Sequence, residues 1–193
     1  MSKQPPNPPS PEGLKKLLDG DFEPLSEALT SANERHFGIR ILSDGTWHYQ
    51  GTPIRRLPLV KLFSTVLRRD EEGRYWLVTP VERGLIDVDA APFVAVEVKA
   101  EGTGRNTRLT FRTNVDDEIV ACKAHPIRVE INPKTEEPTP YIHVRDNLDA
   151  LITRPVFYEL ADIAEEMVNG TKVELRVWSD GTMFSLGMAE IGE

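Results

Sequence analysis

Three arginines lie next to the expected starts of two helices, where helix electrostatics gives them chemical meaning. Arg55 and Arg56 come just before a helix that Pro58 can start, and Arg154 comes just before a second helix, near Pro155. The amino end of a helix carries partial positive charge, so it disfavours a cation by roughly 0.3 to 1 kcal/mol and attracts an anion. Free amide groups beside a guanidinium suit a phosphate or a carboxylate. The pattern predicts an anion site, and pairing of these arginines with the many acidic residues is the alternative.

Aromatic side chains would extend such an anion site toward a nucleotide-like ligand. Trp47, Tyr49 and Tyr158 can each stack on a base or another ring, and each can instead pack in the core. We expect a small phosphate-bearing or nucleotide-like ligand between two units of the chain. Such a site needs neither a nucleophile nor an activated base, so a binding module is the first hypothesis for the function.

A hydrolase-type enzyme is the second hypothesis. It would use His125 with Asp116 or Glu118, and these side chains would have to converge in the folded chain. Cys122 and His125 also have the types of a thiol and its base, but residues three apart on a strand point to opposite faces. We therefore expect a buried thiol beside a turn histidine, and a solvated acidic turn after Asn114. A protein-interaction scaffold is the third hypothesis.

The motifs of several enzyme and cofactor classes are missing from the sequence. The four histidines are scattered without paired spacing, so we expect no metal site. The run GTGR at 102–105 lacks the ending of a phosphate-binding loop. No Gly-x-Ser-x-Gly, His-Glu-x-x-His or kinase motif occurs. We expect no cofactor, and the case for an enzyme from motifs is weak.

Composition narrows the partners and the location. The 193 residues contain 23 Lys and Arg against 31 Asp and Glu, and the net charge of −8 repels nucleic acid. A single cysteine, Cys122, fits a reducing compartment, so we expect the cytoplasm. No segment approaches ~18 continuous apolar residues, and the amino terminus lacks a signal-peptide pattern, so we expect no membrane span.

Apolar spacing and turn residues set the expected elements of the first half. Five prolines among the first eleven residues predict a disordered tail over 1–10, and a short capped helix follows over 11–20. Asp44-Gly45 predicts the turn of a β-hairpin. Apolar residues at helical spacing predict one face of a helix over 59–67.

The second half is expected to be mainly strands. Seven short runs between residues 74 and 145 have strand length and are separated by turn residues, which predicts an antiparallel meander. A helix is expected from Pro155 to Asn169, and Asp180-Gly181 predicts a closing hairpin. The fold class is therefore α+β.

Two internal echoes favour related units over one continuous sheet. The run SDGTWHYQG at 43–51 returns as SDGTMFSLG at 179–187, and the chemistry of Asp-Gly turns is the alternative explanation of this likeness. A second echo, offset by 66 residues, relates the stretch 75–86 to 141–152 through shared Tyr, Val, Leu and Ile positions. We expect two units, over 11–100 and 101–193.

Three runs carry a resemblance to a known family: SDGTWHYQGTPIRRLPLVKLFSTVLRRDEEGRYWLVTPVERGLIDV, TNVDDEIVACKAHPIRVEI and LDALITRPVFYELA. In order and in their short motifs they resemble the uncharacterised bacterial family called domain of unknown function twelve-eighty-five. The likeness covers roughly residues 37 to 190. Residues 21–36 and the proline-rich tail fit the family pattern less well.

The resemblance implies a duplicated core of two small α+β domains, each with antiparallel strands and one packed helix, the second superficially like a pleckstrin-homology fold. It also implies a nucleotide-like ligand at the domain interface and a role in signal transduction, with a signalling protein as a possible partner. No catalytic residues are established for the family. The polar positions that would carry the interface site are Arg55, Thr79, Glu82, Thr113, Asn114, His125, Arg128, Arg145 and Arg154. A structural role is the alternative for each of them. For example, Thr79 and Asn114 lie at the ends of expected strands, and Glu82 can pair with a neighbouring arginine.

Overall fold

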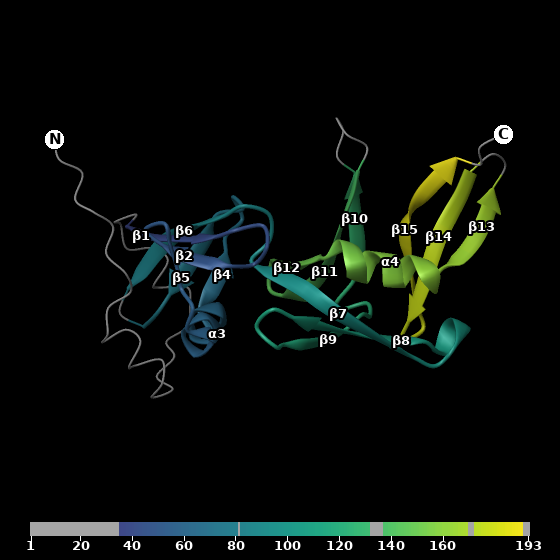
Figure 1. Cartoon of the computed structure of the whole chain (residues 1–193), viewed down its shortest axis with the longest axis horizontal. Coiled ribbons are helices and arrows are strands. Elements are labelled where there is room, and N and C mark those ends of the chain that lie inside the picture. Colours follow the sequence, from purple (N-terminus) through teal and green to yellow (C-terminus); the bar gives the residue numbers. More distant parts are fainter. Residues whose placement is uncertain (1–34, 81, 132–136, 170–171, 191–193) are drawn as a thin grey trace. The chain divides into compact units, whose positions relative to one another are not determined.

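The computed structural model describes residues 35–80, 82–131, 137–169 and 172–190 (Figure 1). Contacts within the chain divide it into two units, Met1–Ala90 and Ala91–Glu193. Each unit is a strand-rich domain with one described helix, so the α+β class with two domains is confirmed. The expected tail at 1–10 and the expected helix at 11–20 lie outside the described residues.

The first unit is a six-stranded sheet with the strand order β3-β2-β1-β6-β5-β4. Its elements are β1 (His36–Ile41), β2 (Trp47–Tyr49), β3 (Thr52–Pro53), α3 (Leu57–Thr65), β4 (Leu67–Arg69), β5 (Tyr75–Val78) and β6 (Arg83–Val88). Neighbouring strands are antiparallel except β1 and β6, which pair in parallel at the centre. The predicted meander has only sequential antiparallel neighbours, so this central parallel pair was not predicted.

The core of the first unit lies between its sheet and α3. Alternation along β1 buries one side of the strand, including Phe37. The helix contributes Val60 and Phe63, and the ring of Phe63 stacks on that of Trp47 with centroids 6.0 Å apart. Trp47 is therefore a core residue and not a residue available to stack on a ligand. The helix ends before Leu67, which the apolar spacing had included in the helix but which begins β4.

The second unit contains a sheet with the order β10-β11-β12-β7-β8-β9. Its strands are β7 (Phe93–Glu101), β8 (Arg108–Thr113), β9 (Glu118–Val120), β10 (Ile127–Ile131), β11 (Pro138–Arg145) and β12 (Leu148–Ile152). A short 3-10 turn, η1 (Gly104–Asn106), joins β7 to β8. Here too the first and last strands, β7 and β12, form a parallel pair at the centre.

The two six-stranded sheets have the same topology. Counted along the chain within each unit, both have the order 3-2-1-6-5-4, with strands 1 and 6 parallel. The echo at an offset of 66 relates Tyr75 in β5 to Tyr141 in β11, and Leu85 in β6 to Leu151 in β12. These are the fifth and sixth strands of each sheet. The second echo therefore marks structurally equivalent strands.

A helix and a three-stranded sheet follow in the second unit: α4 (Arg154–Asp162), β13 (Glu165–Asn169), β14 (Lys172–Ser179) and β15 (Thr182–Glu190). The helix buries Val156 and Leu160 and contacts β7. The sequence predicted one helix as far as Asn169, and this was wrong. Residues 165–169 pair with β14 instead, so hydrogen bonding within the sheet overrides the helical apolar spacing there.

The first echo reflects turn chemistry in two unrelated hairpins. Gly45 joins β1 to β2 with φ of 80°, and Gly181 joins β14 to β15 with φ of 69°, so both predicted turns are confirmed. The preceding Asp180 also has positive φ, at 48°, which Asp44 lacks. The two turns are therefore of different types, and they lie in sheets with different topologies.

The boundary between the units lies earlier than the sequence indicated. A division after residue 100 would cut through β7, whereas the chain divides between Ala90 and Ala91. The reason is that β7 pairs with β8 and β12, both of the second unit. Of the helices described, none is long and apolar enough to cross a membrane.

Candidate functional site

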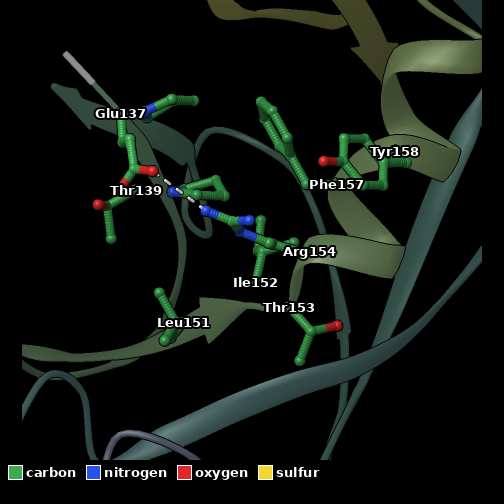
Figure 2. Close-up of a pocket in the computed structure, with 10 residues that line it drawn as sticks. Glu137, Thr139, Leu151, Ile152, Thr153, Arg154, Phe157 and Tyr158 are labelled. Atoms are coloured by element: carbon green, nitrogen blue, oxygen red, sulfur yellow. Dashed lines mark hydrogen bonds and ion pairs between the residues drawn. The ribbon is translucent and has the colours of Figure 1, made fainter. Parts of the chain in front are cut away.

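A cavity of about 350 Å³ opens at the amino end of α4, within the second unit. Three elements surround it: the start of β11, the end of β12 and the first two turns of the helix. Figure 2 shows the arginine of the helix start pointing across the cavity. The lining residues are Glu137, Pro138, Thr139, Pro140, Leu151, Ile152, Thr153, Arg154, Phe157 and Tyr158.

The start of α4 presents positive charge to this cavity. Thr153 precedes the helix, but its side chain makes no capping hydrogen bond, and the first turn contains no acidic residue. The helix dipole is therefore not neutralised from within the helix. Arg154, the first helical residue, forms an ion pair with Glu137 at 3.3 Å (Figure 2). The pairing that the sequence left open as an alternative is thus present for this arginine.

The walls of the cavity are mostly apolar and are held by buried neighbours. Leu151 and Ile152 come from β12, and Ile152 is buried. Phe157 is half-buried and Tyr158 is exposed, so an aromatic ring and a phenol hydroxyl are available on the helix side. A mainly apolar pocket with a few polar groups at one end is the usual form of a small-molecule site.

A second, wider depression of about 830 Å³ lies elsewhere in the second unit, and we call it the polar groove. Its residues are Arg108, Asp116, Asp117, Glu118, Ile119, Val120, Cys122, His125, Val144, Arg145 and Asp180. The groove thus brings His125 together with Asp116 and Glu118, the three residues of the hydrolase hypothesis. Four carboxylates against two arginines make it a poor receptor for an anion.

The placement of Cys122 and His125 corrects the strand argument. Residues 122–125 form a tight turn, in which the amide of Cys122 donates to the carbonyl of His125 at 3.2 Å and the reverse bond is 3.1 Å. Both side chains therefore line the polar groove instead of opposite faces of a strand. The Nδ1 atom of His125 lies 3.2 Å from the carbonyl oxygen of His143. That contact directs one ring nitrogen to the backbone.

Thr113 and Asn114 organise the turn that carries the acidic residues. The hydroxyl of Thr113, which is fully buried, accepts the amides of Val115 at 3.3 Å and Asp117 at 3.1 Å. The Oδ1 atom of Asn114 accepts the amide of Val94 at 3.0 Å. These two predicted site residues therefore hold backbone groups, which is the structural explanation that the sequence also allowed.

Arg128 and Arg145 are paired within the second unit. Arg128 donates to Asp149 at 2.8 Å and to Glu130, and its guanidinium lies 4.5 Å from the ring centre of Tyr141. Burial lowers the pKa of Arg128, but these hydrogen bonds outweigh burial and the pKa is raised. Burial is also the main cause of the raised pKa of Tyr141. Arg145 pairs with Asp117 at 3.3 Å.

The remaining predicted residues belong to the first unit. Arg55 and Arg56 are exposed before α3, whose start likewise has no side-chain cap and no acidic first turn. Thr79 is buried, and its hydroxyl accepts the amide of Glu82 at 3.1 Å and donates to the carbonyl of Glu82 at 3.0 Å. The carboxylate of Glu82 pairs with Arg35 at 3.3 Å. Thr79 and Glu82 therefore close a turn.

The sequence missed most of the cavity beside Arg154. Thr139 was assigned to no element and Leu151 was noted only in the second echo, although Tyr158 was named as a stacking residue. Alternation along β11 and β12 indicated which side chains share a face, but not that α4 would border that face. The described residues contain no group of three or more His, Cys, Asp or Glu side chains that could hold a metal ion.

Comparison with protein families matches both units. The model described as "Domain of unknown function (DUF1285), N-terminal domain" matches residues 29–91. The model described as "Protein of unknown function (DUF1285), C-terminal domain" matches residues 92–186. The join between these matches lies one residue from the boundary between the two units. A search of curated proteins found no match.

Two solved structures are similar to the chain. A DUF1285 family protein from Silicibacter pomeroyi DSS-3 is 48% identical, with a TM-score of 0.71 over 80% of this chain and 83% of that one. A DUF1285 family protein from Shewanella baltica OS155 is 21% identical, with a TM-score of 0.51 over 65% of this chain and 91% of that one, which supports the fold alone. From the two family matches and the 48% identity, the chain belongs to the uncharacterised DUF1285 family.

Proposed function

We propose that this protein is a regulatory binding protein for a small nucleotide-like anion, held at the amino end of α4. One observation carries the proposal: an arginine, an uncapped helix start and a mainly apolar cavity of about 350 Å³ occur together. Cavities that take small ligands begin at roughly 300 Å³. Arg154 and the first amides of α4 would bind the phosphate. Leu151 and Phe157 would contact the ring.

The ion pair between Arg154 and Glu137 leaves room for such a ligand. The side chains are 77% and 62% exposed, and exposed pairs of this kind contribute about 0 to 1 kcal/mol. A phosphate carries more charge than one carboxylate and can accept two parallel bonds from the guanidinium. A ligand phosphate therefore replaces Glu137 at little cost.

A regulatory role follows from what α4 is attached to. Its buried residues Val156 and Leu160 pack in the core of the second unit, and its carboxyl end leads through a short turn into β13. A ligand at the first turn would bias the position of the helix and hence of the strands after it. We infer a role in cytoplasmic signal transduction on this basis, and the partner would read the liganded state.

A thermal-shift comparison of three compounds tests the ligand class. The compounds are AMP, adenosine and inorganic phosphate, which separate the contributions of the anion and the ring. At a hundred times its dissociation constant, a ligand adds about 2.7 kcal/mol to the unfolding free energy. We expect AMP to raise the melting temperature most. If none of the three shifts it, the proposal is wrong and the scaffold hypothesis gains.

Two arginine variants locate the site. Arg154→Ala should abolish the shift, whereas Arg108→Ala, an exposed arginine of the polar groove, should leave it unchanged. The opposite pattern would assign the ligand to the polar groove and contradict the proposal. Glu137→Gln removes the carboxylate that competes for Arg154, so it should tighten AMP binding by up to about fivefold.

Hydrolysis in the polar groove is the second candidate function. The observation in its favour is that His125, Asp116 and Glu118 line one groove. Such an activity would require the free ring nitrogen of His125 to act as a base. Turnover of an activated ester or phosphodiester that His125→Ala abolishes would support it. Equal rates for the wild-type chain and the His125→Ala variant would exclude hydrolysis by His125.

A further inference from the structure

The three-stranded sheet ends in a strand whose outer edge is unpaired in the part of the chain that the structure describes. Its order is β13-β14-β15, so β13 and β15 are its outer strands, and β15 lies near β10 (Figure 1). An edge strand presents a row of free amide and carbonyl groups, and most proteins protect such an edge with prolines, bulges or charges along its length. The regular register of β13 on β14 shows no bulge, and its two charged residues, Glu165 and Glu166, lie at the start of the strand, so residues 167–169 are uncharged.

Apolar side chains are exposed on both faces at the far end of this sheet. Met167 and Met188 flank Glu174 on one face, because these three residues are in register across the strands. Met167 is 50% exposed and Met188 is 72% exposed. On the other face Val168, next to Val173, is 62% exposed. Exposed apolar side chains on an open strand edge indicate an interaction surface.

The buried part of the same sheet lies toward its other end. Val177, Phe184 and Leu186 are buried, and the hydroxyl of Ser179 accepts the amide of Leu109 from β8 at 2.9 Å. The core of the unit therefore covers the sheet near the turn at Asp180 and leaves Met167 and Val168 of β13 exposed. The exposed edge of β13 therefore belongs to the part of the sheet that the core of the unit does not cover.

We propose that β13 pairs with β13 of a second copy of this chain, antiparallel and with Met167 at the two-fold axis. In this register Met167 lies opposite Met167 of the partner, and Glu166 lies opposite Val168 of the partner. The charges select this arrangement. Parallel pairing would bring Glu165 and Glu166 next to the same residues of the partner, whereas antiparallel pairing places Glu165 opposite Asn169 and Glu166 opposite Val168, so no carboxylate faces another directly.

Self-pairing also satisfies the symmetry of a closed dimer. A two-fold axis perpendicular to the sheet gives one six-stranded sheet, with β15 at each edge, and uses the same surface of both copies. The two methionines at the axis cover each other, and Met188 lies on the same face of each half. A contact through five-residue strands is at the small end of specific interfaces, so the dimer should be weak and concentration-dependent.

Sedimentation of the full chain as a function of concentration tests the dimer. We expect a monomer–dimer equilibrium that Met167→Lys abolishes. Met183→Lys is the matched control, because Met183 is an exposed methionine of the same sheet at the end near the turn. It should leave the equilibrium unchanged. A chain that stays monomeric at millimolar concentration would overturn the proposal. The same result is expected if β13 pairs with a strand of another protein and not with itself.

Disulfide trapping tests the register and does not depend on Met167→Lys folding. In the Cys122→Ser chain, Met167→Cys places the two new thiols on directly opposed residues, roughly 5 Å apart at Cα, within disulfide range. Val168→Cys places them about 8 Å apart, beyond that range. We expect the position-167 variant to form covalent dimers under mild oxidation at least tenfold faster than the position-168 variant. Equal rates, or faster dimer formation at position 168, would overturn the proposed pairing.

Discussion

Thr113→Val separates a structural role of Thr113 from the ligand role that the family resemblance implied. Valine has nearly the same shape, so the change removes an acceptor without opening a cavity. The hydroxyl accepts two backbone amides, and that of Val115 is deeply buried, since Val115 is 3% exposed. A buried donor left without a partner costs about 1 to 3 kcal/mol. The second amide, of half-buried Asp117, can reach water and should add less.

We therefore expect Thr113→Val to lower the unfolding free energy by about 2 to 3 kcal/mol. For a unit of this size that corresponds to a melting temperature lower by roughly 10 °C or more, measured by calorimetry. Thr113→Ser is the control. It keeps the acceptor and loses one buried methyl group, so it should cost only about 1 kcal/mol.

The melting temperatures of the two Thr113 variants decide whether the hydroxyl holds the turn. If Thr113→Val melts at the wild-type temperature, or costs less than Thr113→Ser, the hydroxyl does not hold the turn. If Thr113→Val is as stable as wild type and also loses the AMP-induced shift, Thr113 is a ligand residue. The turn would then have to be stabilised by the backbone bond from the Thr113 amide to Asp117, which is 2.9 Å long.

Three further changes test the account of the fold. Gly84→Ala should lower the unfolding free energy by about 1 to 3 kcal/mol in urea denaturation, because a Cβ there would lie 2.6 Å from the buried ring of Phe37. Burial opposes ionisation of Asp70, but hydrogen bonds from Trp76 and Arg74 outweigh it and lower its pKa below 3.8. Asp70→Ala should therefore destabilise at pH 7, with the difference shrinking as the pH falls below 3.8, whereas a pH-independent difference would contradict the assignment. Gly181→Ala should cost about 1 to 2 kcal/mol of stability through backbone strain alone, since φ is 69° and no atom crowds the position, while Gly181→Asn should cost less in the same assay.

The local elements could be predicted where the signal is itself local. Asp-Gly pairs fix tight turns through backbone conformation, so both hairpins were found. Most strands were found from alternation and turn residues, but β3, β4, β12 and β13 were not. The helix predicted to reach Asn169 failed because Met167 and Val168 take part in a sheet whose other strands follow later in the sequence. The helical spacing of Val156, Leu160, Ile163 and Met167, on which that helix was predicted, cannot reveal this competition.

The site was harder to predict than the elements. Arg154 was found because a cation at a helix start is unusual on electrostatic grounds. The cavity beside it depends on β11, β12 and α4 meeting in space, which the sequence does not encode in a local pattern. Thr79, Thr113 and Asn114 were named because the family resemblance implied polar positions at an interface, whereas turn formation accounts for their contacts. The parallel central pair of each sheet was missed for the same reason as the cavity.

The most direct test of the central claim is a titration of the isotopically labelled full chain with AMP, followed by amide chemical shifts. The account predicts that the largest changes occur at Arg154, Val156 and Phe157, in the first turn of α4, and that Arg154→Ala removes them. Saturating changes at His125 and around the turn 113–118, with the first turn of α4 unaffected, would contradict it.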